Sequence, residues 1–386
     1  MAGIYIHIPF CRKACNYCNF HFSTGLKNKG NMVNAIAKEI TTLSANRNTL
    51  STLNPTPSAL IETIYFGGGT PSLLSGDELK QILGAVHQSF NVSPAAEITL
   101  ETNPDDHSAE MLDAWKSSGI NRLSIGVQSF HEADLVWMNR AHNASQSIGC
   151  IKAAQDKGFQ NLTIDLIYGT PGLTDDRWRQ NFDSAIELRI PHLSCYALTV
   201  EPKTALDSLI AKGKMQPVDA GQQANQFLLL MDWAIEAGFE HYEISNFAKP
   251  GHRSRHNSNY WSGVPYYGFG PSAHSFDGGK SRWWNVANNG LYVQAVENHL
   301  PHTETELLTP AQQLNEYIMT SLRTLEGIGA AGNGHAFITP KDFELLVAKA
   351  TKWQLQGKVL ITADAIRLTN EGKLFADGIA GDLFLP

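Results

Sequence analysis

Three cysteines near the N-terminus, Cys11, Cys15 and Cys18, have a C-x3-C-x2-C spacing that brings three thiol groups into one loop. Three thiolates this close repel one another unless a cation binds them, and soft sulfur ligands select zinc or an iron-sulfur cluster. A structural zinc site needs a fourth ligand, and His7 and His21 are the nearby candidates. A 4Fe-4S cube held by three cysteines instead leaves one iron open to a small molecule. The spacing therefore indicates a metal centre. The centre would be structural if it holds zinc and reactive if it holds an iron-sulfur cluster.

The elements that must position this loop alternate between strand and helix patterns. Six apolar segments predict parallel strands, at residues 3–8, 61–66, 97–101, 122–127, 162–168 and 192–200. A distinctive feature ends each strand: the cysteine loop, Gly67-Gly68-Gly69-Thr70, Glu101, Gln128, Asp165 and Tyr196-Ala197. Function lies at the carboxyl ends of the strands in (β/α) barrels. Six such features in register therefore favour an α/β fold with a partial (β/α)6 TIM-like barrel over a doubly wound sheet.

The pattern changes after the sixth strand. Residues 201–217 resemble a loop, residues 222–237 have a strong helical pattern, and the following segment is rich in glycine, aromatic residues and histidine. The tail predicts two helices, a two-stranded wing at 359–361 and 366–368, and a short helix from Glu371. We therefore expect three parts: the barrel at 1–238, an aromatic and histidine-rich linker region at 239–300, and a small α+β winged-helix-like domain at 301–386.

Composition and charge narrow the classes of function. The 386 residues are 42% hydrophobic and carry a net charge of -7, which argues against nucleic acid as the main partner. Charges cancel between residues 341 and 386, so we expect the wing to pack as a lid rather than to read DNA. The sequence lacks a signal peptide pattern and any run of about 18 apolar residues, so we expect a cytoplasmic protein.

Five signatures recur along the predicted barrel: Y-I-H-I-P-F-C at 5–11, G-G-G-T-P at 67–71, E-T-N-P at 101–104, G-V-Q-S-F at 126–130 and D-L-I-Y-G at 165–169. Through them nearly the whole chain resembles the oxygen-independent coproporphyrinogen III oxidase-like branch of the radical S-adenosylmethionine (radical SAM) superfamily. The resemblance implies a 4Fe-4S cluster bound by Cys11, Cys15 and Cys18. It also implies contacts to S-adenosylmethionine (SAM) from Tyr5, Tyr17, Gly68, Gly69, Thr70, Glu101, Gln128, Arg140, Asp165 and Ala197.

Two departures separate the chain from the oxidases of this branch. Phe20 stands where the oxidases have a further cysteine, and the first strand begins at Gly3 without their N-terminal extension. The segment His256-Asn257-Ser258-Asn259-Tyr260-Trp261 matches the H-N-x-x-Y-W motif of the HemW-type haem chaperones. That resemblance implies a protein that binds haem and passes it to respiratory haem proteins.

The residues themselves support a haem site less directly. A lone imidazole such as His256 can ligate haem iron, and Arg253, Arg255 or Arg282 could pair with the propionates. The alternative is that His256 is a hydrogen-bonded residue among packed aromatic rings.

Three functions are compatible with the sequence. A haem chaperone with a radical SAM core is favoured, a coproporphyrinogen III oxidase of porphyrin biosynthesis is the alternative, and a radical SAM enzyme acting on RNA is disfavoured by the charge. A homodimer and a peripheral membrane contact are compatible with the sequence as well. The sequence identifies neither the protein that accepts haem nor whether SAM is cleaved.

Overall fold

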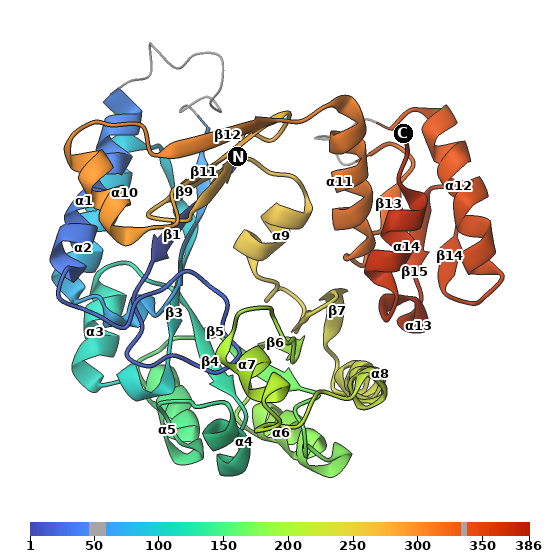
Figure 1. The fold of residues 1–386 in the computed structure, drawn as a ribbon, viewed down its shortest axis with the longest axis horizontal. Helices are drawn as coiled ribbons and strands as arrows, with labels where there is room; N and C mark the ends of the chain where they lie inside the picture. The colour runs from blue at the N-terminus through green and yellow to red at the C-terminus, as the bar shows by residue number, and fades with distance from the viewer. Residues whose placement is uncertain (46–58, 333–337) are drawn as a thin grey trace.

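The fold is built on one large mixed sheet, in a computed structural model that describes residues 1–45, 59–332 and 338–386 (Figure 1). The strand order is β12-β11-β10-β9-β1-β2-β3-β4-β5-β6-β8-β7. The six parallel strands at its centre follow one another in chain order: β1 (Ala2–Ile8), β2 (Ile61–Gly68), β3 (Val92–Thr102), β4 (Arg122–Gln128), β5 (Asn161–Tyr168) and β6 (His192–Ala197). This arrangement confirms the predicted partial (β/α)6 barrel.

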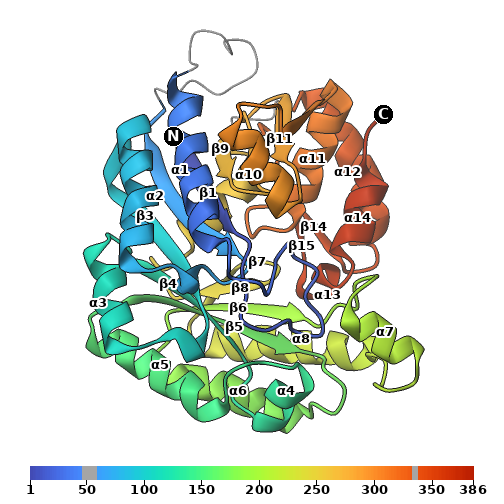
Figure 2. The same cartoon turned by 60° about the vertical axis from the view of Figure 1, so that its left-hand side comes forward.

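Helices connect successive parallel strands and cover the outer face of the sheet (Figures 1 and 2). They are α1 (Lys29–Ala45), α2 (Gly76–Ser89), α3 (Ala109–Ser117), α4 (Glu132–Trp137), α5 (Ala144–Asp156) and α6 (Asp175–Glu187). The start of α2 is a capping box, in which the Ser75 hydroxyl accepts from the Glu78 amide and the Glu78 carboxylate accepts from the Ser75 amide. Helices cover one face of the parallel strands, and the other face packs inside the barrel. The strands are therefore buried nearly throughout, which explains their continuous apolar runs.

The region after the barrel adds strands to both edges of the sheet. At one edge, β8 (Asn246–Ala248) pairs antiparallel with β6, and β7 (Glu240–Glu243) pairs with β8. At the other, β9 (Tyr266–Phe269) pairs parallel with β1 and is followed by β10 (His274–Phe276), β11 (Ser281–Asn285) and β12 (Thr303–Leu307). The helix α10 (Asn289–Glu297) lies beside α1 (Figure 2). Residues 240–307 are therefore continuous with the sheet of the barrel.

Two helices follow β6, which ends at Ala197 rather than at residue 200. The prediction of a loop over 201–217 was wrong, because α7 (Ala205–Ala211) lies within it. Leu206 of α7 is fully buried in a small apolar cluster with Met138 and Leu198. Packing thus stabilises a helix of two turns that has too few residues to show a clear apolar period. The predicted long helix is confirmed as α8 (Ala220–Glu236).

The C-terminal segment has an apolar core of its own. Its elements are α11 (Pro310–Leu322), β13 (Ile328–Gly329), α12 (Pro340–Gln354), β14 (Val359–Ile361), β15 (Ala365–Leu368), α13 (Asn370–Lys373) and α14 (Ala376–Leu383). The predicted two-stranded wing gains a third strand, because β13 pairs with β15. Backbone hydrogen bonds from Ile244 to Arg323 and from Leu325 to Tyr242 tie this segment to the end of β7. None of the helices in the described ranges is both long and apolar enough to cross a membrane.

Candidate functional site

A cavity of about 390 Å³ lies at the carboxyl ends of the six parallel strands. Most of the residues predicted to bind a cluster or SAM line it: Cys11, Cys15, Tyr17, Cys18, Gly68, Gly69, Thr70, Glu101, Gln128, Arg140, Asp165 and Ala197. Two predicted residues do not line this cavity. Tyr5 lies one layer away, with its ring stacked on Tyr65 and its hydroxyl 3.2 Å from His7 Nδ1. His256 lies on α9 (Arg255–Trp261), apart from the cavity. The structure thus joins features that are up to 186 residues apart in the sequence, from Cys11 to Ala197.

The cysteine loop is fixed at its base and along its length. The Cys11 amide donates to Ser23 O at 3.0 Å, and the Ser23 amide donates to Pro9 O at 2.9 Å, which closes the base of the loop. Asn16 Nδ2 donates to Trp137 O at 3.0 Å, and Asn139 Nδ2 donates to Ala14 O at 2.8 Å. The segment after β4 therefore holds the loop over the cavity.

Two side chains donate hydrogen bonds to the cysteine sulfurs. Thr70 Oγ1 lies 3.4 Å from Cys11 Sγ, and Arg140 Nη1 lies 3.2 Å from Cys15 Sγ. Burial raises the pKa of the Cys11 thiol to about 11 and raises the pKa of the Cys18 thiol as well. These thiols become thiolates near neutral pH only if a positive centre binds them.

The surroundings of the two histidines bear on the zinc alternative. His7 Nδ1 lies next to the Tyr5 hydroxyl, and His7 Nε2 is 2.8 Å from His21 O, so both of its ring nitrogens have partners. His21 Nε2 is 2.8 Å from Asn289 Oδ1. Across the described ranges, no three His, Cys, Asp or Glu side chains form a group that could hold a metal ion, so the three cysteines would have to draw together around either kind of centre. A Cys3His zinc site would need one histidine to leave its partners, whereas a three-cysteine cluster site needs no histidine.

The glycine edge after β2 allows two close backbone contacts. Gly68 has a φ of 104°, and a Cβ there would lie 2.5 Å from His7 Cε1. A Cβ on Gly69 would lie 2.6 Å from Phe10 O. Only glycine fits this packing against the end of β1, and it also leaves the backbone of both residues exposed to the cavity. The glycines therefore have a structural role in addition to the predicted contact with SAM.

Two half-buried carboxylates, Glu101 on β3 and Asp165 on β5, face the cavity from either side of β4. Glu101 Oε1 accepts a hydrogen bond from the Tyr65 hydroxyl at 2.8 Å. Burial, with a contribution from Asp165, raises the pKa of Glu101 to about 7, and burial raises the pKa of Asp165 to about 6. A cationic ligand would stabilise the charged forms of both groups and would be attracted by them. The pair is thus suited to an ammonium or sulfonium group.

Asn103 connects two of the predicted residues, although the sequence prediction did not include it. Its Nδ2 donates to Thr70 Oγ1 at 3.2 Å, and its Oδ1 accepts from Arg140 Nη2 at 2.6 Å. Arg140 Nη2 also donates to Gly126 O at 2.9 Å. The position of Asn103, two residues after Glu101 at the end of β3, was the available signal. Asn103 therefore holds together the two side chains that contact the cysteine sulfurs.

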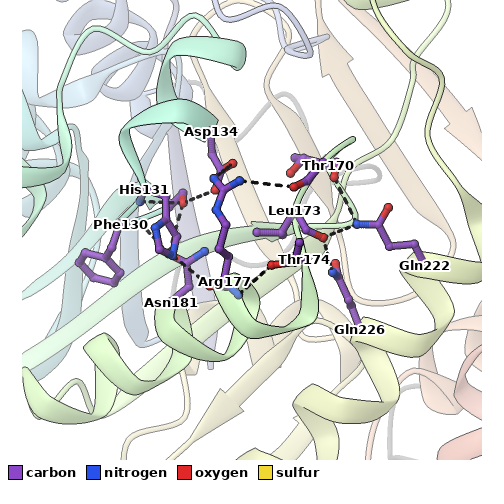
Figure 3. Close-up of polar contacts among 12 residues, drawn as sticks. Phe130, His131, Asp134, Thr170, Leu173, Thr174, Arg177, Asn181, Gln222 and Gln226 are labelled. Atoms are coloured by element: carbon purple, nitrogen blue, oxygen red, sulfur yellow. Dashed lines mark hydrogen bonds and ion pairs between the residues drawn. The ribbon is translucent and has the colours of Figure 1, made fainter.

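A polar network holds the segment that follows Gln128 at the end of β4, where Phe130, His131 and Asp134 lie beside Arg177 and Asn181 (Figure 3). Gln128 has a φ of 66°, a left-handed conformation that residues other than glycine rarely adopt. The Phe130 amide donates to Asn181 Oδ1 at 2.7 Å, and Arg177 of α6 forms an ion pair with Asp134 of α4. These contacts fix the segment that follows Gln128, and this surrounding structure maintains the unfavourable backbone of Gln128.

His256 is buried, with 2% of its surface exposed, and both of its ring nitrogens have partners. Nδ1 is 2.8 Å from Thr63 Oγ1, and Nε2 is 2.9 Å from the Tyr260 hydroxyl. The ring stacks on Tyr65 with centroids 5.0 Å apart. Glu97 Oε1 accepts from the His256 amide at 3.2 Å and thereby anchors the start of α9. Haem ligation by His256 stays a prediction, and it requires the imidazole to leave at least one of these partners.

Comparison with known proteins agrees with this geometry. Residues 5–185 match the radical SAM superfamily. The chain is 33% identical to "Heme chaperone HemW" of Bacillus subtilis, over 99% of this chain and 98% of that protein. It is 31% identical to "Heme chaperone HemW" of Escherichia coli, again over 99% of this chain and 98% of that protein. Among solved structures, coproporphyrinogen III oxidase (HemN) of Escherichia coli superposes with a TM-score of 0.82, over 99% of this chain and 90% of that chain, at 20% identity. The last similarity shows a shared fold.

Replacing Cys15 with alanine should abolish cluster binding, because each thiolate of the loop is expected to hold a different iron. The measurement is iron content and visible absorption after anaerobic reconstitution. Cys150→Ala is the matched control, since Cys150 is buried away from the cavity and should keep full iron content. Zinc in place of iron in the unmodified, reconstituted protein would contradict the cluster.

Replacing His256 with alanine should lower the free energy of unfolding by about 1 to 3 kcal/mol near neutral pH, because Thr63 and Tyr260 lose a buried partner. Burial lowers the pKa of folded His256 to about 3, whereas an unfolded histidine titrates near 6.5. The native protein therefore loses the contribution of His256 as the pH falls from 6.5 towards 3, and the difference between the two proteins should shrink over that range. Urea unfolding at several pH values measures it. A difference that grows on acidification would contradict this role.

Proposed function

The chain belongs to the HemW family of the radical SAM superfamily, and we propose that it is a haem chaperone that binds a 4Fe-4S cluster, SAM and haem and passes haem to respiratory haem proteins. The observation that supports the cofactor part is that three cysteines, the glycine edge and two half-buried carboxylates line one cavity together. Similarity over nearly the full length to proteins named heme chaperones supports the haem part.

In this proposal Cys11, Cys15 and Cys18 hold the cluster. A cluster bound by three thiolates supplies one-electron chemistry and one iron that can accept a small-molecule ligand. The hydrogen bonds from Thr70 and Arg140 to the sulfurs fit this role, because such bonds tune the reduction potential of a cluster. Asn103 would keep both donors in place.

The other wall of the cavity would bind SAM. The exposed backbone of Gly68 and Gly69 can approach the amino and carboxylate groups of a ligand closely. Glu101 and Asp165 provide negative charge for its cationic centres once the ligand lowers their pKa values. These residues would orient SAM and exclude water, whether or not SAM is cleaved in the working cycle.

The oxidase alternative shares the fold, and one residue at the cavity argues against it. Phe20, which stands where the oxidases have a further cysteine, lines the cavity with 67% of its surface exposed. A phenyl ring cannot supply a thiol for redox or acid-base chemistry at that point. We therefore propose that the protein binds haem rather than a porphyrinogen. We also propose that it is cytoplasmic and has no nucleic acid partner. A homodimer and a peripheral membrane contact stay predictions.

The anaerobically reconstituted protein should bind haem and release it to the apo form of a respiratory haem protein. It should not convert coproporphyrinogen III to protoporphyrinogen IX with SAM and a reductant. Haem binding and transfer are followed by the Soret band, and porphyrin products by chromatography after oxidation. Clear turnover of coproporphyrinogen III without haem transfer would replace the chaperone with the oxidase.

A further inference from the structure

Two neighbouring cavities lie between the barrel and the C-terminal segment, where α9 faces α11 (Figure 1). Their volumes are about 380 Å³ and about 430 Å³, and Trp261 and Tyr317 line both. We call the two cavities together the interdomain cleft. Cavities of this size at the junction of two structural units are common sites for small ligands and cofactors. The cleft is separate from the cavity that contains the cysteines, and the two share no lining residue.

One half of the interdomain cleft is aromatic and apolar. Tyr260, Trp261, Tyr266, Phe276 and Met319 line it, together with three glycines. The Tyr260 and Tyr266 rings meet edge to face with centroids 4.6 Å apart. Met319 has 42% of its surface exposed, so its thioether borders the opening. Aromatic faces and a flexible thioether are suited to a large flat apolar ligand.

The other half of the cleft is polar. Arg253, Arg367, Ser258 and Ser262 line it, and Glu326 and Asp364 are its carboxylates. Arg253 forms ion pairs with Glu240 and Glu326, whereas Arg367 donates a hydrogen bond from Nε to the backbone oxygen of Glu326 at 3.1 Å. Ser258 Oγ and Trp261 Nε1 are buried donors without a hydrogen-bond partner in the described part of the chain. Such donors are costly unless an acceptor reaches them, and a ligand carboxylate would satisfy them.

The unpartnered donors give the cleft a direction, whereas net charge does not. At the apolar end Arg282 pairs with both Glu306 and Glu316, at 2.7 Å and 2.6 Å. At the polar end Arg253 pairs with both Glu240 and Glu326, so both ends carry paired arginines. Ser258 Oγ and Trp261 Nε1 lack acceptors in the described part of the chain, so a ligand with carboxylates would place them at the polar end beside Arg253 and Arg367, and its apolar edge beside Met319.

We propose that haem binds in the interdomain cleft, with the macrocycle against Trp261 and the propionates directed towards Arg253 and Arg367. This inference rests on the proposed function, because it takes haem as the ligand. It gives the residues of the H-N-x-x-Y-W segment separate roles. His256 positions α9 through Thr63 and Tyr260, while Tyr260 and Trp261 present their rings to the cleft.

The test fills the apolar half of the cleft. Met319→Trp adds bulk at an exposed side chain of α11, and Leu345→Trp on α12, with 45% exposure against 42% for Met319, is the matched control outside the cleft. Haem titrations of the cluster-loaded proteins should show a Kd at least about tenfold higher for Met319→Trp, equal to about 1.4 kcal/mol of binding free energy. The control should keep the native Kd. Both variants should keep native iron content and SAM binding, which also shows that they fold.

A second measurement tests the direction of the ligand. The native protein should bind haem more tightly than haem dimethyl ester, because the ester has no carboxylates for the arginines. Arg367→Ala should weaken haem binding while leaving the ester nearly unaffected, so the preference should shrink. Equal losses for both ligands would contradict the propionate assignment.

The outcomes separate the two proposals. If the native protein binds haem and Met319→Trp binds it equally well, the cleft is not the haem site, and the proposed function stands. If the native protein binds no haem, the proposed function fails and the cleft proposal fails with it.

Discussion

The arrangement of this molecule depends on one electrostatic constraint: three thiols in a partly buried loop cannot all ionise without a positive centre between them. Burial raises the pKa of Cys11 to about 11, so the loop by itself favours neutral thiols. A cluster would supply the missing positive charge. The structure around the loop meets the same constraint with Arg140, whose guanidinium donates to Cys15 and is held by Asn103. Loop closure at Ser23 and the contacts with residues 137–139 then keep the sulfurs at the ends of the strands.

The interior of the barrel links this cavity to α9. Tyr65 stacks on His256, and its hydroxyl donates a hydrogen bond to Glu101. Glu97 accepts a hydrogen bond from the His256 amide and so anchors the start of α9. Its Oε2 lies 4.0 Å from Nε of the fully buried Arg122. The H-N-x-x-Y-W segment on α9 is therefore packed against the barrel, with the ring of Tyr65 between His256 and the carboxylate that faces the cavity. His256 fixes this packing through Thr63 and Tyr260.

Local sequence signals predicted the parallel strands, the register of features at their carboxyl ends and most helices. They predicted that the features at the strand ends lie together, because alternation of strand and helix places successive strand ends at one edge, whereas the full set of SAM contacts came from the family resemblance. They could not show the partners of His256, since Thr63 is 193 residues away in the chain. The short helix α7 and the edge strands β9 to β12 were missed for a similar reason, because tertiary contacts decide whether such short segments are regular. Asn103 belongs to the E-T-N-P signature, but only its contacts with Thr70 and Arg140 show what its side chain does.

The central claim is that the three thiols and the SAM-binding wall form one site through a shared cluster. The most direct test is calorimetric titration of SAM into the same protein before and after anaerobic cluster reconstitution. We expect tight binding only after reconstitution, because the cluster provides the open iron and the positive charge that the empty loop lacks. Equal SAM affinity in both forms would contradict the account, since the wall of glycines and carboxylates would then bind SAM without the cluster.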